Sequence, residues 1–238
     1  AAHGVYGTSA ITAVTAQNTR GVRKIFALAP AIVAAQIDAV VEDIGADAVK
    51  TGMLCNAAIV EMIARRIRAH QLPNVVVDPV MVATSGKLLL RRDAIAALKT
   101  KLIPLAAVLT PNVPEAEALT GIRLTRTVNF KEAARRIIEM GASNVVIKGG
   151  HRIGAATDLF YDGRHFREFS ARRVRTRNTH GTGCTFASAI AANLAKGLKP
   201  EQAVERAKEY LTRAIEESYA VGPGQGPVNH FYGLSKRR

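Results

Sequence analysis

Apolar residues along the chain follow two kinds of pattern. Short runs rich in β-branched residues predict buried strands, and longer segments with apolar residues every three or four positions predict amphipathic helices. We predict strands at residues 9–15, 47–50, 75–77, 107–110, 145–147, 158–161 and 165–169. Helices are predicted at residues 30–42, after Asn56, at residues 93–103, after Asn129, from Gly183, and from about Pro200 to Ser218.

Local signals support several of these boundaries. Asn56 is a good N-cap residue, and Ile59, Ile63 and Ile67 follow it on one helical face. Asn129, with an acidic residue three positions later, resembles a capping box and predicts a helix start. The Asp-Gly pair at residues 162–163 is a hairpin signal, so the two segments beside it are expected to pair as antiparallel strands.

The alternation of strands and helices predicts one α/β domain over residues 1–238, with a mostly parallel sheet covered on both faces. Ligands of such sheets bind beyond the carboxyl ends of the strands. The candidate site residues are therefore those that follow the apolar runs: Gln17, residues 50–53, residues 78–80, residues 110–115 and residues 148–151.

A glycine-rich segment, Thr179-His180-Gly181-Thr182-Gly183-Cys184, stands directly before the helix that carries Phe186. Its glycines permit a tight turn and a close approach to a ligand. The backbone amides at the start of the helix would form an anion site, which could hold the charge that develops during phosphoryl transfer. Spacing alone leaves open an ordinary glycine-rich turn into a helix.

Two cysteines are present, and their settings differ. Cys184 falls in the first turn of the predicted helix, where the helix field lowers a thiol pKa and a thiolate could take a proton from a substrate hydroxyl. The alternative is a small buried apolar residue. Cys55 has no such setting and is interpreted as structural.

Two further motifs follow predicted strands. Asn112 and Glu115 could hold a hydrated Mg²⁺, or they could form a helix cap with the acidic residue at the helix N-terminus. Lys148, with the glycines after it, could approach a phosphate, or the segment could be a β-turn. The chain has no GxxxxGK[ST] motif, which excludes a P-loop enzyme.

Composition limits the remaining possibilities. The 238 residues suit one large domain, and two cysteines do not make a disulfide framework, so we expect a reducing cytoplasm. No apolar stretch is long enough to span a bilayer. The net charge of +14 indicates either a nucleic-acid binder or an enzyme of anionic ligands with a basic surface. The second is favoured, because the basic clusters are scattered and no aromatic residues stand among them.

Taken in order, the motifs resemble those of the hydroxymethylpyrimidine/phosphomethylpyrimidine kinase family, which belongs to the ribokinase-like superfamily. The matching segments are residues 15–19, 50–53, 77–81, 109–112 with Glu115, 148–151, 180–184 and 226–230. The resemblance runs from Gly4 to Tyr232. It implies a three-layer α/β/α fold, ATP, Mg²⁺ and two successive phosphorylations of a pyrimidine in thiamine biosynthesis.

The resemblance also implies roles for individual residues. Gln17, Met53 and Val80 would contact the pyrimidine, and Lys148, Thr179 and His180 would lie near the nucleotide. Asp78, Asn112 and Glu115 would organise the metal and phosphates. Gly181, Thr182 and Gly183 would form the anion hole, with Cys184 in the place where most ribokinase-like enzymes have an aspartate base.

The resemblance leaves three points open. The family has a strand and a glycine-rich, aspartate-containing loop ahead of Gly4, and this sequence, which begins at Ala1, is expected to lack both. Pyridoxal kinase is the nearest alternative, because its substrate is also an aromatic nitrogen ring with a hydroxymethyl arm. A non-catalytic nucleic-acid-binding regulator is a more distant alternative. Family members often form dimers, so a homodimer is expected.

Overall fold

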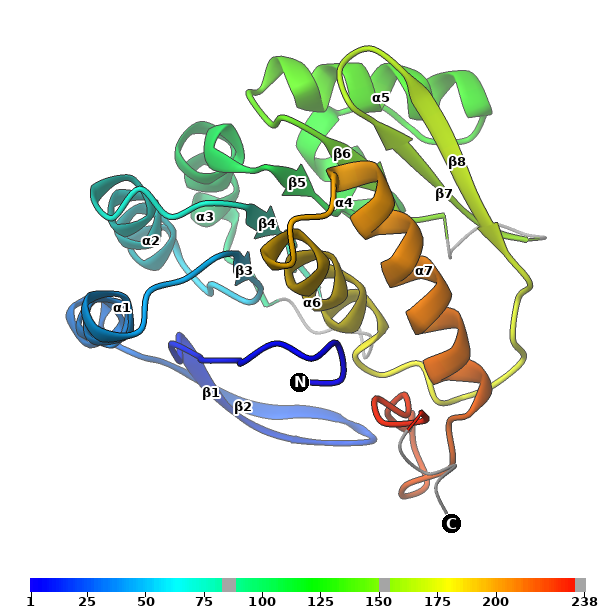
Figure 1. The fold of residues 1–238 in the computed structure, drawn as a ribbon, viewed down its shortest axis with the longest axis horizontal. Helices are drawn as coiled ribbons and strands as arrows, with labels where there is room; N and C mark the ends of the chain where they lie inside the picture. Colours follow the sequence, from blue (N-terminus) through cyan, green and yellow to red (C-terminus); the bar gives the residue numbers. More distant parts are fainter. Residues whose placement is uncertain (83–88, 150–154, 234–238) are drawn as a thin grey trace.

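The computed structural model describes residues 1–82, 89–149 and 155–233. Gly150 and His151, the last two residues of one candidate motif, lie outside this part of the chain. The described residues form a layered α/β structure in which helices cover both faces of a central sheet (Figure 1). This arrangement confirms the predicted three-layer fold.

The central sheet has six strands in the order β3-β4-β5-β6-β7-β8. The pairs from β3 to β6 are parallel, while β6–β7 and β7–β8 are antiparallel. The sheet is therefore mostly parallel with an antiparallel extension, and the Asp-Gly turn joins β7 to β8 as predicted. The strands are β3 (Val49–Thr51), β4 (Val75–Val77), β5 (Val108–Leu109), β6 (Val145–Ile147), β7 (Ala156–Tyr161) and β8 (Phe166–Ala171).

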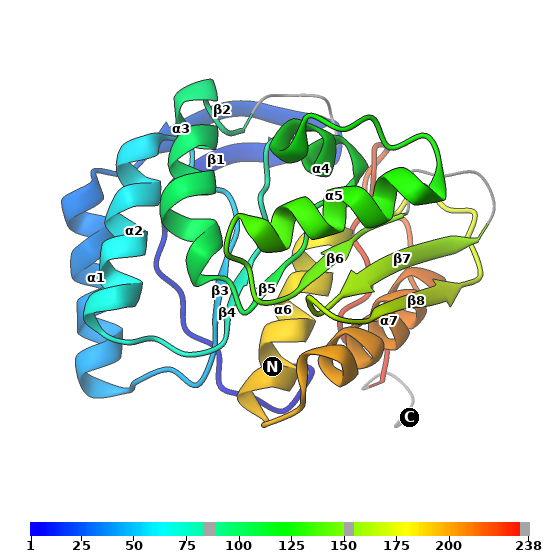
Figure 2. The same cartoon turned by 90° about the horizontal axis from the view of Figure 1, so that it is seen from above.

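Two groups of helices flank this sheet, as the two perpendicular views show (Figures 1 and 2). One face carries α1 (Pro30–Asp43), α2 (Ala57–Ala69), α3 (Arg92–Ala97), α4 (Val113–Thr120) and α5 (Thr127–Glu139). The other face carries α6 (Thr182–Ala195) and α7 (Pro200–Glu216).

The alternation of side chains along β4 shows how the two cores are built. Val75 and Val77 pack into the α1–α5 core, whereas Val76 packs against α6 and α7. Successive strand residues point to opposite faces, so every position of a covered strand must be apolar or partnered. Because Lys50 pairs with Val76 in the β3–β4 register, its side chain starts on the α6 face.

The prediction of a strand at residues 9–15 was only partly right. The strand β1 (Ala13–Asn18) begins later and pairs with β2 (Gly21–Ala27) in a separate antiparallel hairpin. Residues before it bond elsewhere, since the backbone of Ile11 exchanges hydrogen bonds with the Gln36 side chain on α1. We did not predict β2, because its polar positions hide the apolar pattern and its turn has no Asn-Gly signal.

Two helix boundaries also differ from the predictions. Asn129 is not the cap of α5: the helix begins at Thr127, and the Asn129 side chain accepts a hydrogen bond from the backbone amide of Arg126. The predicted helix at residues 93–103 is α-helical only to Ala97, then widens into a π turn at Leu98–Leu102 and narrows into a 3₁₀ turn at Ile103–Leu105. Pro104 has no amide to donate backwards, so the α-helix cannot continue through it.

Candidate functional site

The centre of the candidate site is an ion pair between Asp78 and Lys148. Asp78 follows β4, Lys148 follows β6, and the lysine Nζ donates to Asp78 Oδ1 at 2.9 Å. The hydroxyl of Thr110, which follows β5, donates to the same oxygen at 3.2 Å. Parallel strands end at one edge of the sheet, so three consecutive strands place these groups together. The Asp78 side chain is only 2% exposed, which makes its partners essential.

Glu115 lies beside this pair at the start of α4. Its Oε2 accepts from the backbone amide of Asn112 at 2.8 Å, and the Asn112 side chain accepts from the Glu115 amide at 2.9 Å. The two residues thus form a capping box, which was one of the two interpretations of this motif. Burial raises the pKa of the Glu115 carboxyl, with a further upward contribution from Asp78, while Lys148 opposes the shift.

Lys148 stays positively charged in this setting. Burial by itself lowers the pKa of an ammonium group, but the carboxylates of Asp78 and Glu115 and the hydrogen bond to Asp78 outweigh it. The net effect raises the pKa of Lys148 above its ordinary value. The site therefore holds a permanent, poorly hydrated cation that can face an anionic ligand.

The glycine-rich segment ends next to the Lys148 ammonium. Gly181 is the N-cap of α6 with a φ of 81°, a left-handed conformation that glycine adopts without strain. A Cβ at Gly183 would lie 3.3 Å from Lys148 Nζ and 3.8 Å from Asp78 Oδ2. The amides of the first helical turn have no partners within the helix, and Gly183 among them lies next to the Lys148 ammonium.

A loop near the C-terminus holds this segment in place. The backbone amide of His180 donates to the carbonyl of Gly226 at 3.0 Å, and His180 forms a parallel bridge with Pro227. A Cβ at Gly226 would collide with the Asn178 side chain, so glycine lets these two segments pack closely. These contacts fix the glycine-rich turn before the helix begins.

The two cysteines lie in the contrasting settings that the sequence suggested. Cys184 is exposed in the first turn of α6 and interacts electrostatically with Lys148. Cys55 is buried, with a φ of 61°, and burial raises the pKa of its thiol. A raised pKa disfavours a nucleophilic thiolate, which agrees with a structural role for Cys55.

The three residues expected near the pyrimidine lie on the β3 and hairpin side of the sheet. Gln17 is on β1 rather than at the end of a central strand, and its Nε2 lies 3.4 Å from His180 Nε2. Met53 follows β3, and its carbonyl accepts from the Thr12 hydroxyl. Val80 follows β4 two residues after Asp78. Thr179 lies in the turn before α6, where its amide donates to the Arg177 carbonyl.

Three charged residues of this region were given no individual role from the sequence, although Lys50 falls within the candidate segment 50–53. Lys50 Nζ lies 4.0 Å from Asp78 Oδ2, on the opposite side from Lys148. Asp158 on β7 accepts from the Gly149 amide at 2.9 Å and pairs with Lys208 of α7 at 2.7 Å. The available signal was a charged residue within a strand, Lys50 in β3 and Asp158 in β7, which a covered sheet rarely tolerates without a partner.

The donor atoms suit a hydrated divalent cation better than a closed metal cage. Among the residues described, no group of three or more His, Cys, Asp or Glu side chains could hold a metal ion. Asp78 and Glu115 are close enough to interact electrostatically, whereas the Asn112 side-chain oxygen is engaged in the cap. Two carboxylates fit Mg²⁺ because this ion keeps several of its waters.

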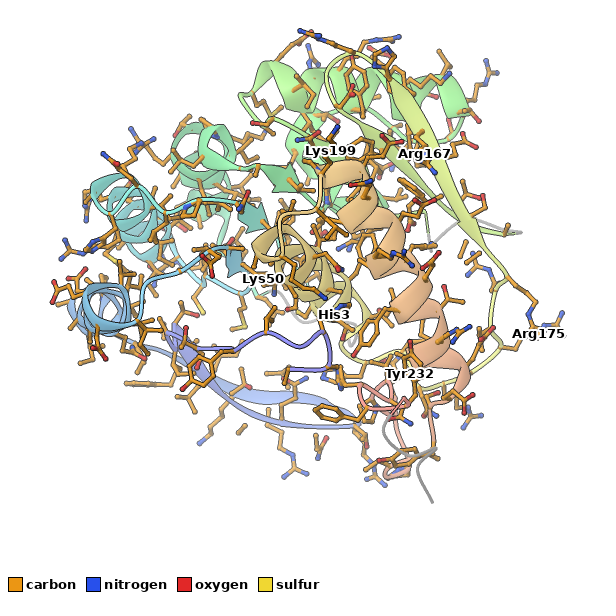
Figure 3. The ribbon with its side chains drawn as sticks, in the orientation of Figure 1. His3, Lys50, Arg167, Arg175, Lys199 and Tyr232 are labelled. Atoms are coloured by element: carbon orange, nitrogen blue, oxygen red, sulfur yellow. The ribbon has the colours of Figure 1, made fainter. Side chains whose placement is uncertain are left out.

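Part of the basic surface is paired within the chain. Arg167 forms ion pairs with Glu201 and Glu205 of α7, and Arg172 lies 3.5 Å from Glu216. Figure 3 shows Arg167 on the sheet side and Arg175 on the loop that leads to α6. In the part of the chain that the structure describes, no helix is long and apolar enough to cross a membrane.

Comparison with protein families and curated proteins gives a consistent result. Residues 1–229 match the family model described as phosphomethylpyrimidine kinase. The hydroxymethylpyrimidine/phosphomethylpyrimidine kinase of Bacillus subtilis is 48% identical over 229 residues, which cover 95% of this chain and 84% of that protein. The thiamine biosynthesis bifunctional protein ThiED of Geobacter sulfurreducens is 51% identical over 96% of this chain. The chain spans 47% of that bifunctional protein.

Solved structures show the same fold. A phosphomethylpyrimidine kinase from Clostridium difficile has a TM-score of 0.80 and 40% identity, over 89% of this chain and 87% of that one. The ADP complex of Bacillus subtilis pyridoxal kinase has a TM-score of 0.89 and 38% identity, over 96% of this chain and 88% of that one. The fold is thus similar to that of a phosphomethylpyrimidine kinase and that of a pyridoxal kinase.

Proposed function

The chain belongs to the phosphomethylpyrimidine kinase family and is a kinase, and from this premise we propose which substrates it uses and how its residues act. It phosphorylates 4-amino-5-hydroxymethyl-2-methylpyrimidine with ATP, and then phosphorylates the monophosphate to the diphosphate, as a step of thiamine biosynthesis. The observation that carries the proposal is that Gly183, in the first turn of α6, lies beside the Lys148–Asp78 ion pair, which supports an anion site at this position.

In the first transfer, the hydroxyl oxygen of the substrate bonds to the γ-phosphorus of ATP, and ADP leaves with the electron pair of the broken bond. The amides of Gly181, Thr182 and Gly183 and the Lys148 ammonium stabilise the charge on the moving group. Cys184 takes the hydroxyl proton, which its exposed position in the first turn of α6 allows. Lys148, Thr179 and His180 lie on the nucleotide side of the site.

Asp78 and Glu115, with Asn112 holding Glu115 in place, would provide the oxygen ligands for Mg²⁺. The bound ion would supply charge neutralisation at the phosphates. The requirement for ATP is supported by the ADP complex of the pyridoxal kinase neighbour. The ring of the substrate lies against Gln17, Met53 and Val80, on the β3 side of the sheet.

A pyrimidine is favoured over pyridoxal as the substrate, because the two curated relatives described above are a thiamine biosynthesis protein and a hydroxymethylpyrimidine/phosphomethylpyrimidine kinase. The test is ATP turnover by the purified protein with each compound, with separation of the monophosphate and diphosphate products. We expect both pyrimidine products. Robust turnover of pyridoxal with none of the pyrimidine would overturn the assignment.

A homodimer through the outer face of the β1–β2 hairpin is part of this proposal. Val14 and Phe26 face each other across the hairpin and are 56% and 69% exposed, so they form an apolar strip. Sedimentation of the protein and of a Phe26→Lys variant tests the dimer, which should dissociate in the variant.

The proposal also includes a location in the cytoplasm. Two unbridged cysteines support such a reducing compartment.

A further inference from the structure

We propose that Lys50 binds the phosphate of the monophosphate substrate and thereby enables the second phosphorylation. The inference rests on the proposed two-step function and names a residue for one of its steps. Figure 3 shows Lys50 beside β3 and α6. Its side chain is 19% exposed, and its Nζ lies 4.0 Å from Asp78 Oδ2.

The two lysines of the site approach Asp78 from opposite sides. Asp78 follows β4, which lies between β3 on one side and β5 and β6 on the other. Lys148 comes from β6, beneath the anion position of α6, and pairs with Oδ1. Lys50 comes from β3, the strand that leads to Met53, and faces Oδ2. The proposed function puts the substrate ring against Met53 and the nucleotide near Lys148. Since Lys50 is on the strand that leads to Met53, it belongs to the substrate side.

The second substrate creates an electrostatic demand that the first does not. Its arm carries a phosphate with a charge of about −1.5 to −2 at neutral pH, by analogy with other phosphate monoesters. This charge must enter a site that already holds the carboxylates of Asp78 and Glu115. Lys148 is directed at the group being transferred, so Lys50 is the cation available for the phosphate that the substrate already carries.

The second step needs no proton acceptor. An oxygen of the substrate phosphate forms a bond to the γ-phosphorus of ATP, the bond from that phosphorus to the bridging oxygen breaks, and ADP leaves with the electron pair. The attacking oxygen is already deprotonated at neutral pH. Neutralising and orienting this phosphate is therefore the main task that the protein has on the substrate side.

Gly52 leaves the space that the Lys50 ammonium occupies. A Cβ at Gly52 would lie 2.7 Å from Lys50 Nζ, and its φ is not in the left-handed region. The backbone therefore accepts alanine, and only the flexible end of the lysine has to move. Gly52→Ala displaces the ammonium without changing the net charge, so it complements Lys50→Met, which removes the charge.

The experiment measures kcat/KM for each phosphorylation separately, with hydroxymethylpyrimidine or its monophosphate as the starting substrate and saturating ATP. We expect Lys50→Met to lower kcat/KM for the monophosphate roughly 10- to 100-fold more than for hydroxymethylpyrimidine, the usual effect of losing a charge-assisted contact. Gly52→Ala should shift the same ratio in the same direction, and Lys50→Arg should restore most of it.

Lys101→Met is the matched control. Lys101 is exposed and precedes β5, so it lies towards the amino ends of the parallel strands, whereas the site lies at their carboxyl ends. It should leave the ratio unchanged. Equal losses in both steps for Lys50→Met would show that Lys50 acts only by holding Asp78, and an unchanged ratio in Lys50→Met or Gly52→Ala would equally overturn the proposal. A wild-type protein that does not phosphorylate the pyrimidine would instead contradict the proposed function.

Discussion

Gly183 of the α6 turn lies directly against Lys148: a Cβ at Gly183 would stand 3.3 Å from the lysine Nζ. The turn and the lysine are 35 positions apart in the sequence but adjacent in the structure. Lys148 is in turn bonded to Asp78 at 2.9 Å. A side chain at position 183 would therefore disturb the amides, the ammonium and the carboxylate together.

Gly183→Ala should lower turnover by roughly 10²-fold, the usual effect of losing one donor to the charge of a transition state. The new methyl group would press on the Lys148 ammonium, while the helical φ at position 183 tolerates alanine. Steady-state kinetics measure the effect, and thermal unfolding should show little change. Ser188→Ala, at an exposed position of the same helix, serves as the control. A variant with normal turnover would place the transferred phosphate elsewhere.

Cys184→Ser separates the thiol from the backbone amides of the same turn. If the thiol accepts the substrate proton, turnover of hydroxymethylpyrimidine should fall by roughly 10²- to 10⁴-fold while ATP binding changes little. Cys184→Asp should recover part of the rate, because a carboxylate can take the same proton. Near-normal turnover of Cys184→Ser at neutral pH would show that the thiol is not the base.

The second phosphorylation provides an internal control for that experiment. Its attacking phosphate oxygen carries no proton to remove, so Cys184→Ser should slow this step much less than the first. Cys55→Ser, at the buried cysteine, should affect stability rather than either rate. A loss of equal size in both steps would indicate that Cys184 contributes space or packing instead of base catalysis.

Glu115→Gln should weaken metal-dependent turnover far more than pyrimidine binding. The glutamine keeps an oxygen that can accept from the Asn112 amide, so the α4 cap is preserved while the charge is lost. Turnover measured across a Mg²⁺ titration, beside pyrimidine binding by calorimetry, checks this. Parallel losses of turnover and pyrimidine binding would indicate that Glu115 acts only as a cap.

The same variant has a predicted effect on stability that depends on pH. Burial raises the pKa of Glu115 above its ordinary value of 4.5, so the folded protein binds this proton more tightly than the unfolded chain does. The free energy of unfolding therefore falls as pH rises from 4.5 through the raised pKa. Relative to wild type, Glu115→Gln should gain stability over this window, as thermal unfolding at pH 4 and pH 8 would show. A pH-independent difference would contradict the assigned shift.

The buried pair of Asp158 and Lys208 should be needed for the conformation of the Lys148–Gly149 segment. Asp158 is 5% exposed and accepts from the Gly149 amide, and a Cβ at Gly149 would lie 1.8 Å from the Thr157 carbonyl oxygen. Asp158→Asn should cost about 3–5 kcal/mol of unfolding free energy, because Lys208 is left buried without its counterion. Chemical denaturation measures this, with Arg167→Met, which removes an exposed ion pair, as the control.

The high net charge is predicted to give no specific affinity for nucleic acid. Any binding to DNA or RNA should be independent of sequence and should weaken steeply as salt is raised towards physiological concentration. Fluorescence anisotropy with two unrelated duplexes over a salt series checks this. Tight, sequence-selective binding at physiological salt would restore the regulatory hypothesis.

Much of the fold could be predicted because the relevant signals are local. The apolar runs at residues 75–77 and 145–147 are buried strands, and the faces of α2 and α6 are those that the helical spacing indicated. The glycine-rich turn was found by the same means, because a left-handed glycine and a helix start lie within a few residues of one another. Local sequence failed where another contact competed, as at Ile11, whose backbone bonds to the Gln36 side chain.

The sequence by itself therefore determined the strands, the helical faces and the turn that opens α6, since each depends on neighbours within a few residues. Only the tertiary structure decided which charges meet. Asp78 and Lys148 are separated by 70 positions, and Asp158 and Lys208 by 50. In the sequence, Lys50 is only a charged residue in a short apolar segment. In the structure, the β3–β4 register directs its side chain towards α6 and Asp78. Strand order and register arise from burying both faces of the whole sheet, so no local pattern can encode them.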